Sequence, residues 1–152
     1  MARVDPVDAR EIEGLVVRYA ELVDDGDFVG VGELLGGATY RWSAAPLVGQ
    51  AEIERWFRDT LIVYPDGTPR TQHVTTNITV EPGGSPDQAS ARSYVTVLQA
   101  APGEVPHVIA AGRYRDRFER QDGVWRFVER AVDIRLVGDL SKHLRLGPAA
   151  EV

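Results

Sequence analysis

Cysteine is absent from the 152 residues of this chain, and its absence removes several kinds of chemistry. Disulfide bonds, thiolate metal sites and cysteine nucleophiles all require a sulfur that the sequence does not supply. The three histidines, His73, His107 and His143, stand far apart, and none belongs to an HExxH or HxH pattern. We therefore expect no zinc or iron site and no metal cofactor.

Phosphate-binding loops are also missing. Neither GxGxxG nor a P-loop is formed by the glycines at positions 30, 32, 36 and 37, and no GxSxG elbow provides the serine of an α/β-hydrolase. The net charge is −6, so the chain lacks the excess of lysine and arginine that contacts to nucleic-acid phosphates require. The sequence favours neither a nucleotide cofactor nor a nucleic-acid partner.

No run of apolar residues approaches the ~20 that a membrane span requires, and the first residues lack the apolar core of a signal peptide. We expect a cytoplasmic protein that contacts no membrane. Hydrophobic residues make up 43% and charged residues 26% of the chain, which fits one globular domain that encloses a core and a pocket. We expect this domain at residues 1–138, followed by a tail at 139–152 that forms a short helix or is partly disordered.

Apolar residues at helical spacing predict an amphipathic helix over residues 8–24, with Asp8 as its N-cap and Gly26 just beyond its end. Asp24 and Asp25 then lie at the unfavourable end of the helix dipole, so another group should hold one of them in place. Two more helices are expected at 28–35 and 50–63.

From residue 65 onward the apolar period changes from that of a helix to that of a strand. A short strand is expected at 39–42, and four long strands are expected at 70–81, 89–100, 107–120 and 124–136. Helices followed by antiparallel strands indicate an α+β domain whose helices pack on one face of a curved sheet.

The strand at 70–81 carries the one histidine in the middle of an expected element. Strict alternation puts His73, Thr75, Asn77 and Thr79 on one side and Val74, Thr76, Ile78 and Val80 on the other. Either the apolar side faces the core and His73 faces water, or His73 lines a polar cavity and the apolar side meets another subunit. The second arrangement predicts an oligomer, because an exposed apolar face is unfavourable in a monomer.

Proton transfer is the chemistry that remains once metals, phosphate loops and covalent nucleophiles are set aside. A histidine titrates near pH ~6.5, so it can take and return a proton at neutral pH when a carboxylate fixes its tautomer. His73 is the first candidate for this role.

Short motifs occur in a fixed order along nearly the whole chain. They are Ile12-x-x-Leu15-x-x-x-Tyr19-x-x-x-x-Asp24-x-Gly26-Asp27, Gly49-x-x-x-Ile53-x-x-Trp56-Phe57, His73-Val-Thr-Thr-Asn77, Gly112-x-Tyr114 and Asp122-Gly-Val-Trp125-Arg-Phe127. This set resembles the SnoaL-like domains of the nuclear-transport-factor-like fold. In that fold a cone-shaped curved sheet, mixed or antiparallel, wraps on about three N-terminal helices and encloses a pocket. The sequence is most similar to the branch of scytalone dehydratase, hexachlorocyclohexane dehydrochlorinase and bile-acid 7α-dehydratase.

The resemblance implies a catalytic pair. In this branch a histidine on the first long strand and an aspartate near the end of the first helix form the dyad, and these positions match His73 and Asp24. The tyrosine of the first helix matches Tyr19, which would either hydrogen-bond a leaving oxygen or pack in the core. We expect the substrate to contact aromatic and basic residues, namely Trp42, Trp56, Phe57, Tyr114 and Arg130, with Arg135 as the alternative to Arg130 because the register of the last strand is open.

The function that the resemblance implies is a cofactor-independent lyase of the dehydratase kind, acting on a small hydrophobic, cyclic molecule. Two alternatives stay open. One is an isomerase or polyketide cyclase in which an aspartate alone is the base, and the other is a non-catalytic subunit that binds a small ligand or supports an oxygenase. A homo-oligomer, trimer or dimer, is also implied. Gln99 lies where scytalone dehydratase has a second histidine, and no acid on that strand matches that of the bile-acid enzyme, so substrate identity does not carry over.

Overall fold

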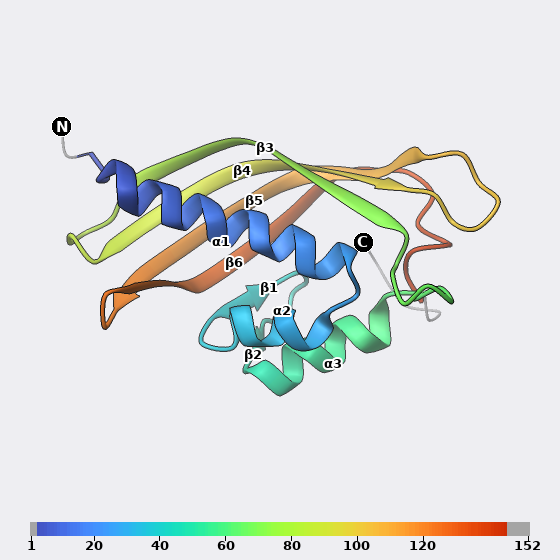
Figure 1. The fold of residues 1–152 in the computed structure, drawn as a ribbon, viewed down its shortest axis with the longest axis horizontal. Helices are drawn as coiled ribbons and strands as arrows, with labels where there is room; N and C mark the ends of the chain where they lie inside the picture. The colour runs from blue at the N-terminus through green and yellow to red at the C-terminus, as the bar shows by residue number, and fades with distance from the viewer. Residues whose placement is uncertain (1–2, 146–152) are drawn as a thin grey trace.

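The computed structural model describes residues 3–145, which form three helices on one face of a six-stranded sheet (Figure 1). The helices are α1 (Pro6–Asp24), α2 (Phe28–Leu35) and α3 (Gln50–Thr60). The strands are β1 (Thr39–Arg41), β2 (Leu47–Val48), β3 (Thr71–Pro82), β4 (Gln88–Gln99), β5 (His107–Gln121) and β6 (Val124–Val137). None of these helices combines the length and the apolarity that a membrane crossing needs.

The sheet has the order β2-β1-β6-β5-β4-β3, and it is mixed because β1 runs parallel to β6 while the other neighbours are antiparallel. The predicted α+β class, with helices against a curved sheet, is confirmed. The third helix ends earlier than expected: after Thr60 the chain is extended, and Leu61 pairs with Leu144 instead of continuing the helix.

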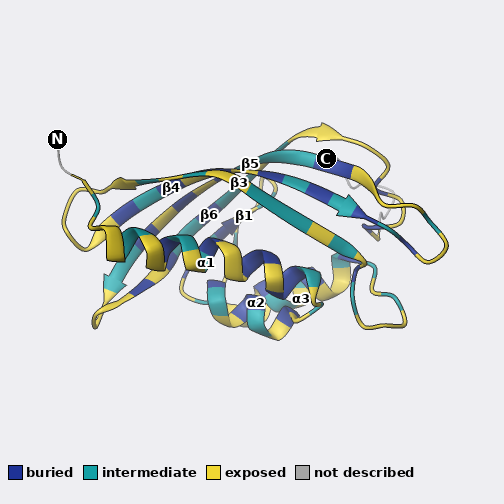
Figure 2. Ribbon diagram, turned by 45° about the horizontal axis from the view of Figure 1, so that its top comes forward, coloured by how far each residue is buried: buried dark blue, intermediate teal, exposed yellow. Residues whose placement is uncertain are grey.

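The core lies between α1 and the concave face of the sheet. Ile12, Val16, Tyr19 and Val23 recur at helical spacing along α1, and all are buried. Figure 2 shows this alternation as dark blue bands on the helix, with exposed positions between them. The same stripe carries Tyr19 toward the sheet and leaves the last turn of α1 beside the start of β3, which positions the candidate site.

The predicted N-cap of α1 is wrong. The helix begins at Pro6, and the Asp5 carboxylate caps it by accepting a 2.8 Å hydrogen bond from the backbone N–H of Val7. Proline fits the first helical position because its missing N–H would have no partner there. Asp8 instead accepts hydrogen bonds from Trp125 Nε1 and from Arg120, 2.9 Å in both cases, and so ties α1 to the sheet.

A β-bulge divides β3 into two halves. The pairing with β4 shifts between Thr76 and Thr79, and Asn77 has a positive φ of 53°, a conformation that asparagine tolerates better than most residues. Before the bulge His73 lies opposite Val97, and after it Val80 lies opposite Ala91; both partners are buried on the inner face of β4. His73 and Val80 therefore face the same side of the sheet.

This bulge overturns the strict alternation expected for β3. Ile78 and Val80 pack against the core, whereas Val74 pairs with Thr96 on the outer face, so these three residues do not form one apolar face. His73 can face inward without exposing Ile78 and Val80. This strand therefore no longer supports the prediction of an oligomer, which now rests on the family resemblance alone.

Gly26 lies in the tight connection between α1 and α2, where a side chain has no room. Its φ is +72°, and a Cβ at this position would collide with the carbonyl oxygen of Gly67. We expect Gly26→Ala to lower the free energy of unfolding by about 2 kcal/mol or more, measured by urea denaturation. Gly37 has no positive φ and open space around it, so Gly37→Ala is the matched control and should change stability by less than about 1 kcal/mol. Equal stabilities of the two variants would contradict the expectation.

Candidate active site

Asp24 ends α1 with its carboxylate held by the first residues of β3. Its Oδ1 accepts a 2.8 Å hydrogen bond from Thr71 Oγ1 and lies 2.6 Å from His73 Nδ1. Its Oδ2 accepts a 2.7 Å hydrogen bond from the backbone N–H of His73. These three contacts offset the unfavourable position at the helix C-terminus, and they orient the imidazole of His73.

The contact to Asp24 determines which nitrogen of His73 is available for chemistry. A carboxylate beside Nδ1 favours the tautomer with the proton on Nδ1, which leaves the lone pair on Nε2. The His73 side chain is only 9% exposed, and Asp24 is 18% exposed. His73 also lines the cavity between the helices and the sheet, so the pair joins a basic nitrogen to an enclosed space.

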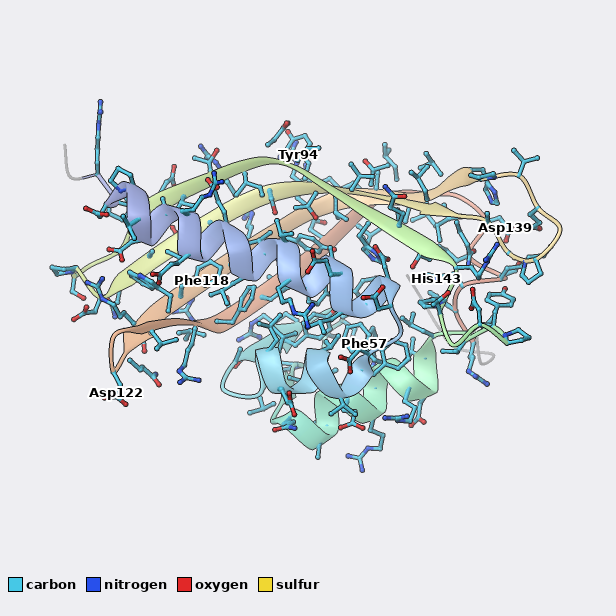
Figure 3. The ribbon with its side chains drawn as sticks, in the orientation of Figure 1. Phe57, Tyr94, Phe118, Asp122, Asp139 and His143 are labelled. Carbon is cyan, nitrogen blue, oxygen red and sulfur yellow. The ribbon has the colours of Figure 1, made fainter. Side chains whose placement is uncertain are left out.

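The cavity is largely apolar and small. Its volume is about 40 Å³, which is room for a few water molecules. Figure 3 shows Phe57 on the helical side of this region and His143 near the start of β3. Aromatic residues from α1, α3, β1, β5 and the loop after β1 form much of its wall, which is completed by aliphatic side chains and two histidines. The lining residues are Tyr19, Tyr40, Trp42, Trp56, Phe57 and Tyr114 with Val23, Leu61, His73, Val97, Ala110, Ile134, Leu140, His143 and Leu144.

Two tyrosines of the aromatic wall are joined through their hydroxyl groups. Tyr19 Oη and Tyr40 Oη lie 2.9 Å apart in a buried hydrogen bond. Burial raises the pKa of both phenols above the usual value, so both hydroxyls are protonated at neutral pH. Two hydroxyls carry two protons and one proton is shared between the oxygens, so the other remains free to bond a ligand oxygen.

Comparison with known proteins places this architecture in a family. The sequence profile of the SnoaL-like domain matches residues 7–131, which include the three helices and every strand up to the middle of β6. The chain belongs to the SnoaL-like family. A comparison with curated protein sequences yields no match.

Solved structures similar to this SnoaL-like domain share its fold at low sequence identity. A protein of unknown function with a cystatin-like fold from Nostoc punctiforme has a TM-score of 0.74 and 18% identity, covering 91% of this chain and 99% of its own. A protein provisionally identified as a scytalone dehydratase from Novosphingobium aromaticivorans has a TM-score of 0.68 and 19% identity, covering 88% and 87%. The β subunit of a provisionally identified aromatic-ring-hydroxylating dioxygenase from the same organism has a TM-score of 0.69 and 17% identity, covering 89% and 94%. The predicted nuclear-transport-factor-like fold is confirmed.

The SnoaL-like domain brings most of the predicted site residues to one cavity. His73 and Asp24 are in hydrogen-bond contact. Five of the predicted aromatic residues line the same cavity as His73, namely Tyr19, Trp42, Trp56, Phe57 and Tyr114. Their roles in catalysis and substrate binding stay predictions. Tyr40 was missed by the sequence analysis. The available signal was its position two residues before Trp42 in the strand expected at 39–42, since such residues point to the same side of a strand.

Arg130 lies behind the cavity wall, not at its surface. Its Nε and Nη2 donate to the two carboxylate oxygens of Asp116, 2.8 Å each, and both side chains are fully buried. Its guanidinium carbon is 4.3 Å from the centre of the Tyr19 ring and 4.0 Å from that of Tyr114. In this structure Arg130 supports the two tyrosines from the far side and is not among the residues that line the cavity.

The register of β6, left open by the sequence, turns Arg130 inward and Arg135 outward. Arg130 lies beside the buried Tyr40 of β1. Arg135 is instead paired with Asp133 at 2.8 Å, and its side chain is 44% exposed. Arg135 therefore does not reach the cavity.

The tail contributes residues to the cavity that the sequence analysis did not predict for the site. Residues 139–145 pack on the body, and Leu140, His143 and Leu144 line the cavity. The remainder of the tail predicted at 139–152, from residue 146 onward, lies outside the described residues. Leucines at 140 and 144 were the available signal, because their spacing indicates one buried face of a helical turn.

Within residues 3–145, no three histidine, aspartate or glutamate side chains converge in an arrangement suited to a metal ion. The family resemblance places Gln99 at the position of the second histidine of scytalone dehydratase. Gln99 is 1% exposed and does not line the cavity. Its Nε2 donates to the carbonyl oxygens of Pro69 and Lys142, 3.0 Å each, and so fastens the tail to the sheet.

Proposed function

We propose that this SnoaL-like domain is a cofactor-independent lyase of the dehydratase kind. The observation that carries the proposal is the 2.6 Å contact between Asp24 Oδ1 and His73 Nδ1 at the edge of an aromatic cavity. A histidine held in this way can accept a proton at Nε2, and the carboxylate stabilises the imidazolium that forms. The apolar walls favour a small hydrophobic, cyclic substrate.

The elimination needs no further reactant. His73 Nε2 takes the proton from a carbon adjacent to an electron-withdrawing group, and the electron pair of that C–H bond forms the new double bond as the C–O bond to a neighbouring hydroxyl breaks. The free hydroxyl proton of the Tyr19–Tyr40 pair hydrogen-bonds the leaving oxygen. His73 then delivers its proton to that oxygen, so that water leaves and His73 becomes neutral again. Such proton transfer contributes roughly 10²–10⁴-fold to the rate.

The occupied oxygens of Asp24 favour histidine over aspartate as the base. Both oxygens already contact β3, through Thr71 and through the backbone and ring of His73. An isomerase or cyclase in which the aspartate alone removes the proton would need one of these oxygens to turn toward the substrate. The geometry therefore supports a histidine base.

The size of the cavity limits the substrate. Sites for drug-sized ligands commonly measure ≈ 300–1,000 Å³, against about 40 Å³ here. A single-ring substrate requires the walls to move apart, and a molecule of several fused rings requires a larger displacement. We therefore propose small, single-ring substrates.

Cyclic β-hydroxyketones in D₂O provide the test, because they carry an acidic carbon and a neighbouring hydroxyl. We expect wild-type protein to release water and form the enone, followed by its ultraviolet absorbance, and His73→Gln to lower this rate by about 10²-fold or more. The matched control is His107→Gln, since His107 is exposed on β5. Full turnover by His73→Gln would refute the histidine base. Deuterium uptake without release of water would indicate an isomerase, and no reaction of any kind would favour a ligand-binding subunit.

A further inference from the structure

The segment after β6 returns across the body and brings His143 to the cavity. The backbone N–H of Ile62 donates to His143 O at 2.8 Å, and the N–H of Arg145 donates to Thr60 O at 2.8 Å. The chain before and after the His143 ring is thus paired with the residues that end α3. The position of His143 is set by regular backbone hydrogen bonds and not by its own side chain.

Two side chains fasten the neighbouring residue. The carbonyl oxygen of Lys142 accepts a 3.0 Å hydrogen bond from Gln99 Nε2 and a 2.6 Å hydrogen bond from Tyr64 Oη. Gln99 belongs to β4 and is buried, whereas Tyr64 comes from the loop after α3. The backbone at His143 is therefore held from the sheet and from the helical side, which fixes the point from which its ring projects.

The imidazole of His143 is buried, and no hydrogen bond joins either of its nitrogens to another residue in the described part of the chain. The residue is 8% exposed, and its Nδ1 is fully enclosed without a partner. A buried polar atom without a partner lowers stability, so it calls for a physical explanation. Leu140 and Leu144, on either side in the sequence, also line the cavity, and a third leucine would fit this apolar surface at lower cost. Stability alone does not account for a histidine here.

The two histidines of the cavity differ in charge. Burial, assisted by the neighbouring His73, lowers the pKa of His143 from 6.5 to about 4 against an opposing effect of Asp24. His143 is therefore neutral at pH 7, with one nitrogen as donor and the other as acceptor. His73 has the carboxylate that a base needs, and His143 has no ion pair within residues 3–145, which suits it to hydrogen bonding and not to proton abstraction.

We propose that His143 is a substrate-binding residue of this site and that its imidazole hydrogen-bonds a hydroxyl group on the ring of the substrate when the walls move apart to admit it. A hydroxyl both donates and accepts, so it can pair with an imidazole nitrogen in either tautomer. The assignment rests on the proposed function, because it takes the cavity beside His73 as the place where substrate binds. It adds a requirement on the substrate: a ring hydroxyl directed at the tail, besides the group that is eliminated.

Phenol and toluene are suitable probes, because they have nearly the same shape and only phenol carries a hydroxyl. With only three histidines in the chain, ¹⁵N NMR of the imidazoles can follow each ring separately. We expect phenol to shift an imidazole ¹⁵N resonance of His143 and toluene to leave both of its resonances nearly unchanged. The ratio of phenol affinity to toluene affinity should fall by about 5- to 10-fold in His143→Leu and stay the same in the exposed control His107→Leu.

The proposal would be overturned if both imidazole resonances of His143 stayed unmoved at saturating phenol, if the affinity ratio were unchanged in His143→Leu, or if phenol did not bind at tens of millimolar. If His143→Leu does not fold, the resonance in wild-type protein decides. This test can be separated from that of the lyase proposal. If wild-type protein turns over substrate but phenol makes no contact with His143, only this inference is overturned. A clear His143 contact in a protein without turnover would overturn the lyase alone.

Discussion

Asp24→Asn should lower turnover by about 10²–10⁴-fold while the protein stays folded. In wild-type protein the carboxylate accepts from Thr71 Oγ1 and from two nitrogens of His73. An asparagine has one oxygen and one NH₂ group, so it can no longer accept from all of them. If its NH₂ faces His73 Nδ1, the imidazole carries its proton on Nε2 and loses the lone pair that would remove a proton from the substrate.

The adjacent Asp25 offers a matched control. It has the same charge and lies at the same helix end, but it is exposed, and its side chain makes no hydrogen bond within the described residues. Asp25→Asn should keep at least half of the wild-type rate. Circular dichroism and urea denaturation of both variants separate a loss of catalysis from a loss of fold. If Asp24→Asn retained more than a tenth of the wild-type rate, the carboxylate would not act through His73.

Arg130→Met should lower the free energy of unfolding by about 3–5 kcal/mol, the largest stability effect that we expect from a single substitution in this domain. The substitution leaves Asp116 in a fully buried position without the two hydrogen bonds of 2.8 Å that now compensate its charge. It also removes the cation that packs against the rings of Tyr19 and Tyr114. Urea denaturation at neutral pH measures the loss.

Arg135→Met is the control for Arg130→Met, because Arg135 lies on the same strand in an exposed pair with Asp133. Exposed pairs contribute little, so this variant should change stability by less than about 1 kcal/mol. A double variant, Arg130→Met with Asp116→Leu, should recover most of the loss, since neither charge is then left unpaired. If the double variant is as unstable as Arg130→Met alone, the loss comes from packing against the tyrosines and not from the stranded carboxylate.

The parts of the fold that the sequence predicts are those specified by local patterns. The apolar residues that include Ile12 and Val16 recur at helical spacing and predict α1, because they lie on one buried face only when the backbone is helical. The long strands follow from alternation between turns of glycine, proline and aspartate. The pairing of Asp24 with His73 came from the family resemblance, since the two residues are 49 positions apart and no local pattern joins them.

Other features depend on contacts that a local pattern does not contain. The bulge at Asn77 inserts one residue against β4, and the alternation of side chains alone gives no sign of it. The N-cap Asp5 was not predicted, because a second acid, Asp8, also precedes the apolar stripe. His143 was not predicted as a cavity residue, because its neighbours in space, His73 among them, come from distant parts of the chain. These residues meet only when the tail folds back.

The bulge in β3 also changes which positions of the strand can point inward together. In a regular strand, residues an odd number of positions apart face opposite sides, so His73 and Val80 would not both face the core. The extra residue at Asn77 reverses the phase of the strand, and both residues lie opposite the inner face of β4. A designer who removed this residue would turn either His73 or Val80 outward, so the contact to Asp24 and the packing of the core both depend on the bulge.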